Sequence, residues 1–177
     1  TLMTQGSYNT TMGVVRTINE ELTPFNQVFV CEMGARQKGD IAEICDIVKP
    51  KYGIITSVGI AHLETFGSTE NIRAAKFELA QAIPSDGLIF LNYDSPPIAA
   101  SGWDRPHISY GLDTECDYRA VDITYDITGA KFTLRCPDGK TLALTTKLLG
   151  RHNVLNITGA AAVALTMGVP DKTLSAA

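Results

Sequence analysis

Apolar runs of strand length alternate with helical patterns through the first half of the chain, and this order limits the folds that it can adopt. Three runs have the composition of buried strands, at residues 28–33, 52–58 and 87–92. Apolar residues at helical spacing predict three helices, at residues 10–22, 40–48 and about 68–83. The first of these helices carries its apolar residues at Met12, Val15, Ile18 and Leu22. This β-α-β-α-β order favours a parallel sheet covered by helices on both faces.

The pattern changes after Asn92. Alternating runs at 117–125, 130–136 and 141–147, separated by turn residues, predict an antiparallel meander. A short helix at 95–101, a short strand at 107–111 and an alanine-rich helix at 153–167 complete the expected elements. We expect one α/β domain over residues 1–177, with a mostly parallel sheet flanked by helices and an antiparallel β-meander extension.

Composition excludes several classes of partner. The 177 residues carry 15 Lys and Arg against 19 Asp and Glu, a net charge of −4, which gives no general attraction to nucleic acid or anionic membranes. No apolar run approaches the ~20 residues of a membrane span. The cysteines are too far apart in sequence to form a zinc ligand pair, and we expect buried, reduced thiols in a cytoplasmic protein. They are Cys31, Cys45, Cys116 and Cys136.

Three polar residues occupy positions at which a functional site is expected. Glu32 closes the first apolar run and His62 follows the second, at strand ends where ligands of parallel sheets bind. Lys76 lies on the apolar stripe of its helix, where an ammonium must be paired, deprotonated or modified. Together they indicate a divalent-cation site or an anion site. Singly, each also fits a structural role, such as a lysine whose head group reaches water.

One apparent phosphate-binding motif fails. Residues 138–141 read DGKT, but Leu134 stands where the motif requires its first glycine. The segment also lies between two alternating runs, which predicts a hairpin turn. No other segment of the 177 residues offers a phosphate cradle.

Five segments occur in a specific order along nearly the whole chain. They are CEMGA at 31–35, GDI at 39–41, HLETFGS at 62–68, AKFEL at 75–79 and GRHNVLN at 150–156. In this order they resemble the central ATPase domain of the Mur ligases, the ATP-dependent amide-forming enzymes of peptidoglycan precursor synthesis. The first three are similar to the member that adds D-alanyl-D-alanine to a UDP-N-acetylmuramoyl tripeptide. Other Mur-type ligases, tripeptide-forming or folylpolyglutamate synthase-like, are the alternatives.

The resemblance implies a role for each candidate residue. Glu32 and His62 would help to hold the Mg²⁺ ions that bridge ATP and an acyl-phosphate intermediate. Lys76 would carry a carbamate, which turns a buried cation into the oxygen ligand that a hard cation prefers.

Four further residues acquire roles from the same resemblance. Asn153 and Asn156 would contact the adenine of ATP, and Asn9 and Thr10 would face substrate and metal. ATP would phosphorylate the tripeptide carboxylate, and the amine of D-alanyl-D-alanine would then attack to give an amide, ADP and phosphate.

The resemblance also implies missing parts. The family's phosphate loop would lie just before Thr1, and the family's N-terminal and C-terminal domains have no counterpart here. We therefore expect a fragment of the central domain that has no ligase activity and at most feeble nucleotide affinity. A non-catalytic binding module would not need a buried lysine beside metal-type ligands. A metal-dependent hydrolase would leave the segment at 150–156 unexplained.

Overall fold

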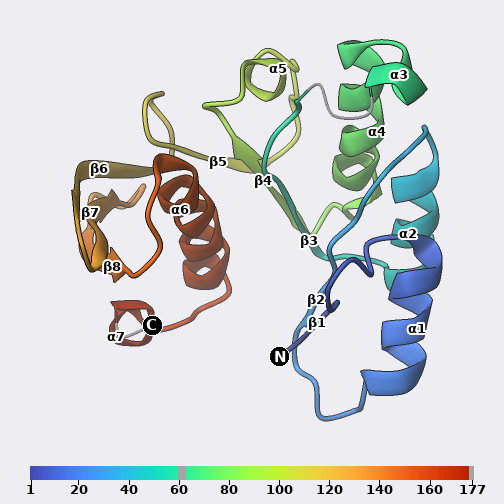
Figure 1. Cartoon of the computed structure of the whole chain (residues 1–177), viewed down its shortest axis with the longest axis horizontal. Coiled ribbons are helices and arrows are strands. Elements are labelled where there is room, and N and C mark those ends of the chain that lie inside the picture. The colour runs from blue at the N-terminus through green and yellow to red at the C-terminus, as the bar shows by residue number, and fades with distance from the viewer. Residues whose placement is uncertain (60–62, 176–177) are drawn as a thin grey trace. The chain divides into compact units, whose positions relative to one another are not determined.

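The computed structural model describes residues 1–59 and 63–175, and these form two compact units (Figure 1). The first unit comprises Thr1–Gly53 and Val58–Gly87, and the second comprises Ile54–Ser57 and Leu88–Ala177. No helix within the described residues is long and apolar enough to cross a membrane.

The first unit contains two short strands and four helices among its described residues. They are β1 (Leu2–Met3), α1 (Thr11–Glu21), β2 (Phe29–Val30), α2 (Asp40–Val48), α3 (Leu63–Phe66) and α4 (Thr69–Ala82). The predicted bounds of α2 are confirmed, and those of α4 agree to within one residue at each end. Ser68 begins α4 because its hydroxyl accepts a hydrogen bond from the Asn71 backbone N–H at 3.1 Å.

The predicted buried strand at 28–33 is wrong in length, burial and pairing. Only Phe29–Val30 is extended, and it pairs in parallel with β1 rather than with the larger sheet. Val30 is 54% exposed. The backbone leaves the ladder because loop contacts replace strand pairing: the Glu32 N–H donates to the Thr4 hydroxyl and the Gly34 N–H donates to the Asn9 carbonyl.

Helix α1 also buries a different face from the predicted one. Val14 and Thr17 are fully buried, whereas Met12 is 76% exposed. The Thr17 hydroxyl donates to the Gly13 carbonyl at 3.1 Å, so this polar side chain is satisfied within its own helix. Apolar spacing alone therefore selected the wrong side of the helix.

The second unit is built on a six-stranded sheet in the order β3-β4-β5-β6-β7-β8. The strands are β3 (Tyr52–Ile55, shared with the first unit), β4 (Leu88–Asn92), β5 (His107–Gly111), β6 (Tyr118–Asp126), β7 (Gly129–Arg135) and β8 (Thr141–Thr146). β4, β5 and β6 are parallel neighbours, and β6, β7 and β8 form the predicted antiparallel meander. The DGKT segment lies in the β7–β8 turn, as predicted.

Three helices complete the second unit: α5 (Pro96–Ala99), α6 (Arg151–Thr166) and α7 (Asp171–Ser175). Helix α6 packs closely on the sheet, since a Cβ at Gly159 would stand 2.8 Å from the Tyr110 ring. The core of this unit includes Phe90 and Leu134 from the sheet and Val154 from α6. β1, α3 and α7 were not predicted from the sequence, because they are short elements with little periodicity.

All four cysteines are free, as expected, but their expected burial is only partly correct. Cys45 is buried, while Cys31, Cys116 and Cys136 are half-buried. Burial raises the pKa of Cys31 and of Cys45 to about 11, so both are protonated thiols at neutral pH.

Asp94 links two loops of the second unit. Its carboxylate accepts hydrogen bonds from the backbone N–H groups of Leu112, Asp113 and Thr114, at 2.6, 3.1 and 3.0 Å. Burial alone would raise the pKa of Asp94, but these hydrogen bonds outweigh it and hold the pKa below its ordinary value of 3.8. Asp94 therefore stabilises the fold above that value, and its contribution is lost as the pH falls through the folded-state pKa.

We expect Asp94→Asn to lower the free energy of unfolding by about 1–3 kcal/mol at neutral pH, because one acceptor oxygen is replaced by a donor. The difference from wild type should shrink in acid, where Asp94 itself is protonated. Denaturant unfolding at several pH values measures this, with the exposed Asp104→Asn as the matched control. An Asp94→Asn defect of equal size at low pH would contradict the assignment.

Candidate functional site

Asn9, Glu32 and Gly34 form a compact arrangement in the first unit. Asn9 lies in the loop before α1, and Glu32 and Gly34 follow β2. The Asn9 side-chain amide donates to Glu32 Oε1 at 3.3 Å, and the Gly34 backbone N–H donates to the Asn9 carbonyl at 2.7 Å. The Glu32 side chain is exposed. The structure thus brings together two predicted site residues, one amide and one carboxylate.

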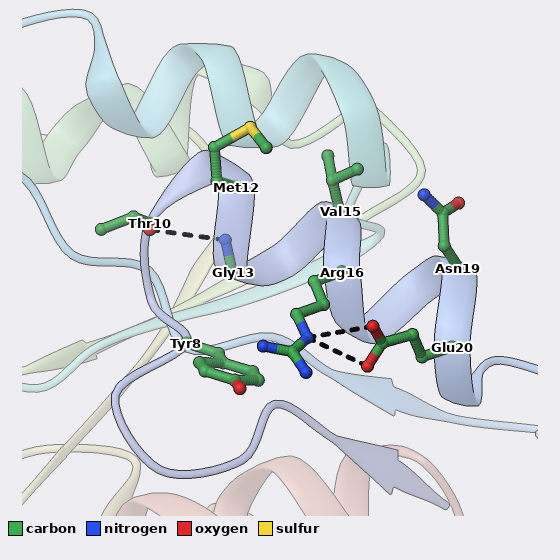
Figure 2. Close-up of a pocket in the computed structure, with 8 residues that line it drawn as sticks. All are labelled: Tyr8, Thr10, Met12, Gly13, Val15, Arg16, Asn19 and Glu20. Atoms are coloured by element: carbon green, nitrogen blue, oxygen red, sulfur yellow. Dashed lines mark hydrogen bonds and ion pairs between the residues drawn. The ribbon is translucent and has the colours of Figure 1, made fainter.

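Thr10 begins helix α1 and borders a shallow pocket. Its hydroxyl accepts a hydrogen bond from the Gly13 backbone N–H at 3.4 Å. The pocket has a volume of about 520 Å³ and follows the outer face of α1 (Figure 2). Its lining consists of Tyr8, Thr10, Met12, Gly13, Val15, Arg16, Asn19 and Glu20. Glu32 and Lys76 are not among these residues.

Arg16 is the cationic residue among those that line this pocket. Its guanidinium lies over the Tyr8 ring, 5.3 Å from the centroid, and pairs with Glu20 at 3.0 Å (Figure 2). The pairing neutralises the one cation that lines the pocket. Tyr8 and Thr10, the residues on either side of Asn9, both line this pocket.

Lys76 lies half-buried on α4. Burial lowers its pKa from the ordinary value of 10.5. Among the described residues no carboxylate pairs with it and no side chain accepts a hydrogen bond from it. A lysine in this environment reaches the neutral amine more readily, and the neutral amine is the form that reacts with CO₂.

His62 lies outside the described residues, so the predicted grouping of Glu32, His62 and Lys76 stays a prediction. Within residues 1–59 and 63–175, no three His, Cys, Asp or Glu side chains gather as a metal site. The donor chemistry nevertheless fits Mg²⁺. Glu32 presents a carboxylate to solvent, and a carbamate on Lys76 would add a second anionic oxygen group.

Glu78 is a buried functional group that sequence reasoning missed. It is only 7% exposed, and it accepts hydrogen bonds from the Gly39 N–H at 2.7 Å and the Ala42 N–H at 3.1 Å. It thereby caps the N-terminus of α2 from α4, using both carboxylate oxygens. Its position one turn after the buried Ala75 is the signal that could have revealed it, because a carboxylate on a core face requires donors.

The predicted adenine residues belong to the second unit and lie on α6. The Asn153 side-chain amide donates to the Leu149 carbonyl at 2.8 Å, which ties down the chain just before the helix. Asn156 is exposed one turn later. Gly150, between Leu149 and the helix, has a φ of +104°, a conformation that glycine adopts without strain.

The chain matches a known protein family over most of its length. The sequence profile of the Mur ligase middle domain matches residues 1–164. The chain belongs to the Mur ligase family. This confirms both the resemblance and the predicted fold class, a mostly parallel sheet flanked by helices.

The individual relatives point to two members of the Mur ligase family. The chain is 38% identical over 133 residues to UDP-N-acetylmuramate–L-alanine ligase of Xanthomonas campestris, a match covering 73% of this chain and 28% of that enzyme. The structure superimposes on MurF from Acinetobacter baumannii with a TM-score of 0.87 and 31% identity, over 98% of this chain and 38% of that one. For MurF of Thermotoga maritima in complex with ADP, the TM-score is 0.85, with 26% identity over 99% and 42% of the two chains.

Proposed function

We propose that this chain is the central-domain part of a ligase that adds D-alanyl-D-alanine to a UDP-N-acetylmuramoyl tripeptide. One observation carries the proposal: nearly the whole chain superimposes on MurF, with a TM-score of 0.87. The EMGA, GDI and HLETFGS segments support the same member. The chain spans 28% of the length of its curated relative, so the activity belongs to the whole enzyme. ATP and the nucleotide-linked tripeptide place that enzyme in the cytoplasm.

The residues of the first unit would position charge rather than form covalent bonds. Glu32, His62 and a carbamate on Lys76 would hold Mg²⁺, which neutralises the charge of the transferring phosphoryl group when bound. Asn9 and Thr10 would face the metal and the tripeptide carboxylate. Orienting that carboxylate and excluding water are contributions that side chains make without chemical change.

Asn153 and Asn156 would provide the adenine side of the ATP site in the second unit. The amide of Asn153 already donates to the Leu149 carbonyl, so this side chain would orient the loop, whereas the exposed Asn156 amide is available to the base. An amide can both donate and accept, as recognition of an adenine edge requires.

A second candidate is UDP-N-acetylmuramate–L-alanine ligase, which the 38% identity with the Xanthomonas enzyme favours. Phosphate release by the intact enzyme that contains this chain separates the two. We expect release with ATP, the UDP-linked tripeptide and D-alanyl-D-alanine. Release only with UDP-N-acetylmuramate and L-alanine would overturn the proposal in favour of the second candidate.

The 177 residues alone are proposed to be inactive, because they contain no G-x-x-x-x-G-K-[ST] loop. The isolated chain should release no phosphate from ATP under conditions in which the intact enzyme is active. ATP turnover by the isolated chain that disappears on Lys76→Ala would contradict this.

A further inference from the structure

We propose that Asn9 is a positioning residue for the Glu32 carboxylate. A glycine at position 34 leaves the space that the Asn9 amide needs for this contact. The proposal rests on the proposed function, in which Glu32 binds Mg²⁺. The family resemblance implies only that Asn9 faces substrate and metal, and the proposal assigns it to the metal side, through Glu32. Asn9 would act through Glu32, and its loss would weaken binding of the metal rather than binding of the tripeptide.

Hydrogen bonds join the loop before α1 to the segment that follows β2. The Glu32 backbone N–H donates to the Thr4 hydroxyl at 3.1 Å, and the Gly34 N–H donates to the Asn9 carbonyl at 2.7 Å. These contacts fix the backbone on both sides of the Glu32 side chain. The Asn9 amide then donates to Oε1 at 3.3 Å, while Oε2 accepts no hydrogen bond from the described residues. One carboxylate oxygen is held, and the other is left for a ligand.

Gly34 makes this arrangement possible by its lack of a side chain. A Cβ at position 34 would stand 3.0 Å from Cγ, 3.1 Å from Oδ1 and 3.2 Å from Nδ2 of Asn9. These distances are shorter than an ordinary van der Waals contact, so the Asn9 amide would have to move. A displacement of a few tenths of an ångström would be enough to disturb the hydrogen bond to Glu32, because that bond is already 3.3 Å long.

An exposed glutamate is otherwise free to adopt several rotamers. Holding one oxygen orders the side chain before the cation arrives, which reduces the entropy lost on binding. Outer hydrogen bonds to metal-binding carboxylates act in this way, and their removal costs about 10–100-fold in metal affinity or activity.

The test measures activation of the intact ligase by Mg²⁺, together with binding of Mn²⁺ by electron paramagnetic resonance. Asn9→Ala and Gly34→Ala should each raise the Mg²⁺ concentration for half-activation by about 10-fold and weaken Mn²⁺ binding to match. The double variant should be little worse than either single variant, because both remove the same contact. Asn26→Ala, which removes a turn-capping amide elsewhere in the unit, is the matched control and should leave Mg²⁺ activation unchanged.

The outcomes of these measurements distinguish failure of the positioning role from failure of the proposed function. If Asn9→Ala raises the KM of the tripeptide and Gly34→Ala does not, Asn9 contacts substrate and the proposal is overturned. If both variants behave like wild type while Glu32→Gln loses Mg²⁺ activation, positioning fails and the proposed function stands. If Glu32→Gln keeps normal Mg²⁺ activation, the metal role of Glu32, and with it the proposed site, is wrong. A lowered Tm in both variants with normal Mg²⁺ activation would also overturn it, since that is a purely structural effect.

Discussion

Glu78→Ala is expected to lower the free energy of unfolding of the first unit by about 3 kcal/mol or more. The change removes two hydrogen bonds from the backbone N–H groups of Gly39 and Ala42 to a buried carboxylate, and a hydrogen bond to a charged group contributes about 1.5–3 kcal/mol. It also removes a negative charge from the N-terminus of α2. For a chain of this size, the corresponding fall in Tm is about 5–10 °C.

Two further variants make the Glu78 result specific. Glu78→Gln keeps one acceptor oxygen and should lose about half as much stability. Gln81→Ala, at an exposed position on the same helix, should have little effect. Hydrogen exchange should locate the loss in the first turn of α2. Equal destabilisation by Glu78→Ala and Gln81→Ala would show that the capping contact contributes nothing.

Lys76→Ala is expected to reduce the turnover of the intact ligase by about 100-fold or more, as removal of a group that stabilises transition-state charge does. The physical reason would be loss of the proposed carbamate that supports the metal. Short carboxylic acids should then restore part of the activity by supplying the missing oxygens. Intact mass measurement in bicarbonate buffer should show wild-type protein heavier by one bound CO₂, and Lys76→Ala should lack this adduct.

Lys51→Ala is the matched control for Lys76→Ala, because Lys51 is an exposed lysine paired with Asp86. It should retain turnover and should not respond to carboxylic acids. Full turnover by Lys76→Ala would refute the carbamate role. Loss of turnover without rescue and without a CO₂ adduct on the wild type would refute it as well.

The pH dependence of the free energy of unfolding tests the burial of Lys76 in its unmodified form. Burial lowers the pKa of Lys76 below its unfolded value of 10.5, so the unfolded chain binds more protons between the two values. Without CO₂, wild-type stability should therefore fall as the pH drops from 10.5 through the folded-state pKa. Lys76→Met should lack this dependence.

Local signals in the sequence predicted much of the fold. The bounds of α2 followed from Gly39 and Asp40 at its start and Pro50 beyond its end, and the meander followed from alternation and turn residues. Periodicity failed for α1, where the buried Thr17 is satisfied by a carbonyl of its own helix. It failed again at residues 28–33, where an apolar run adopts strand geometry for only two residues.

Sequence alone was enough for the family, for most of the order of strands and helices, and for the residue types available for chemistry. Only the tertiary structure showed that Asn9 donates a hydrogen bond to Glu32, that a Cβ at position 34 would crowd the Asn9 amide, and that Glu78 caps a helix from another helix. The Asn9–Glu32 contact joins residues 23 positions apart, and the Gly39–Glu78 contact joins residues 39 positions apart. The constraint on Gly34 depends on the position of Asn9. Helical and strand periodicity describes neighbours within one element. Contacts between elements arise only when the chain has folded.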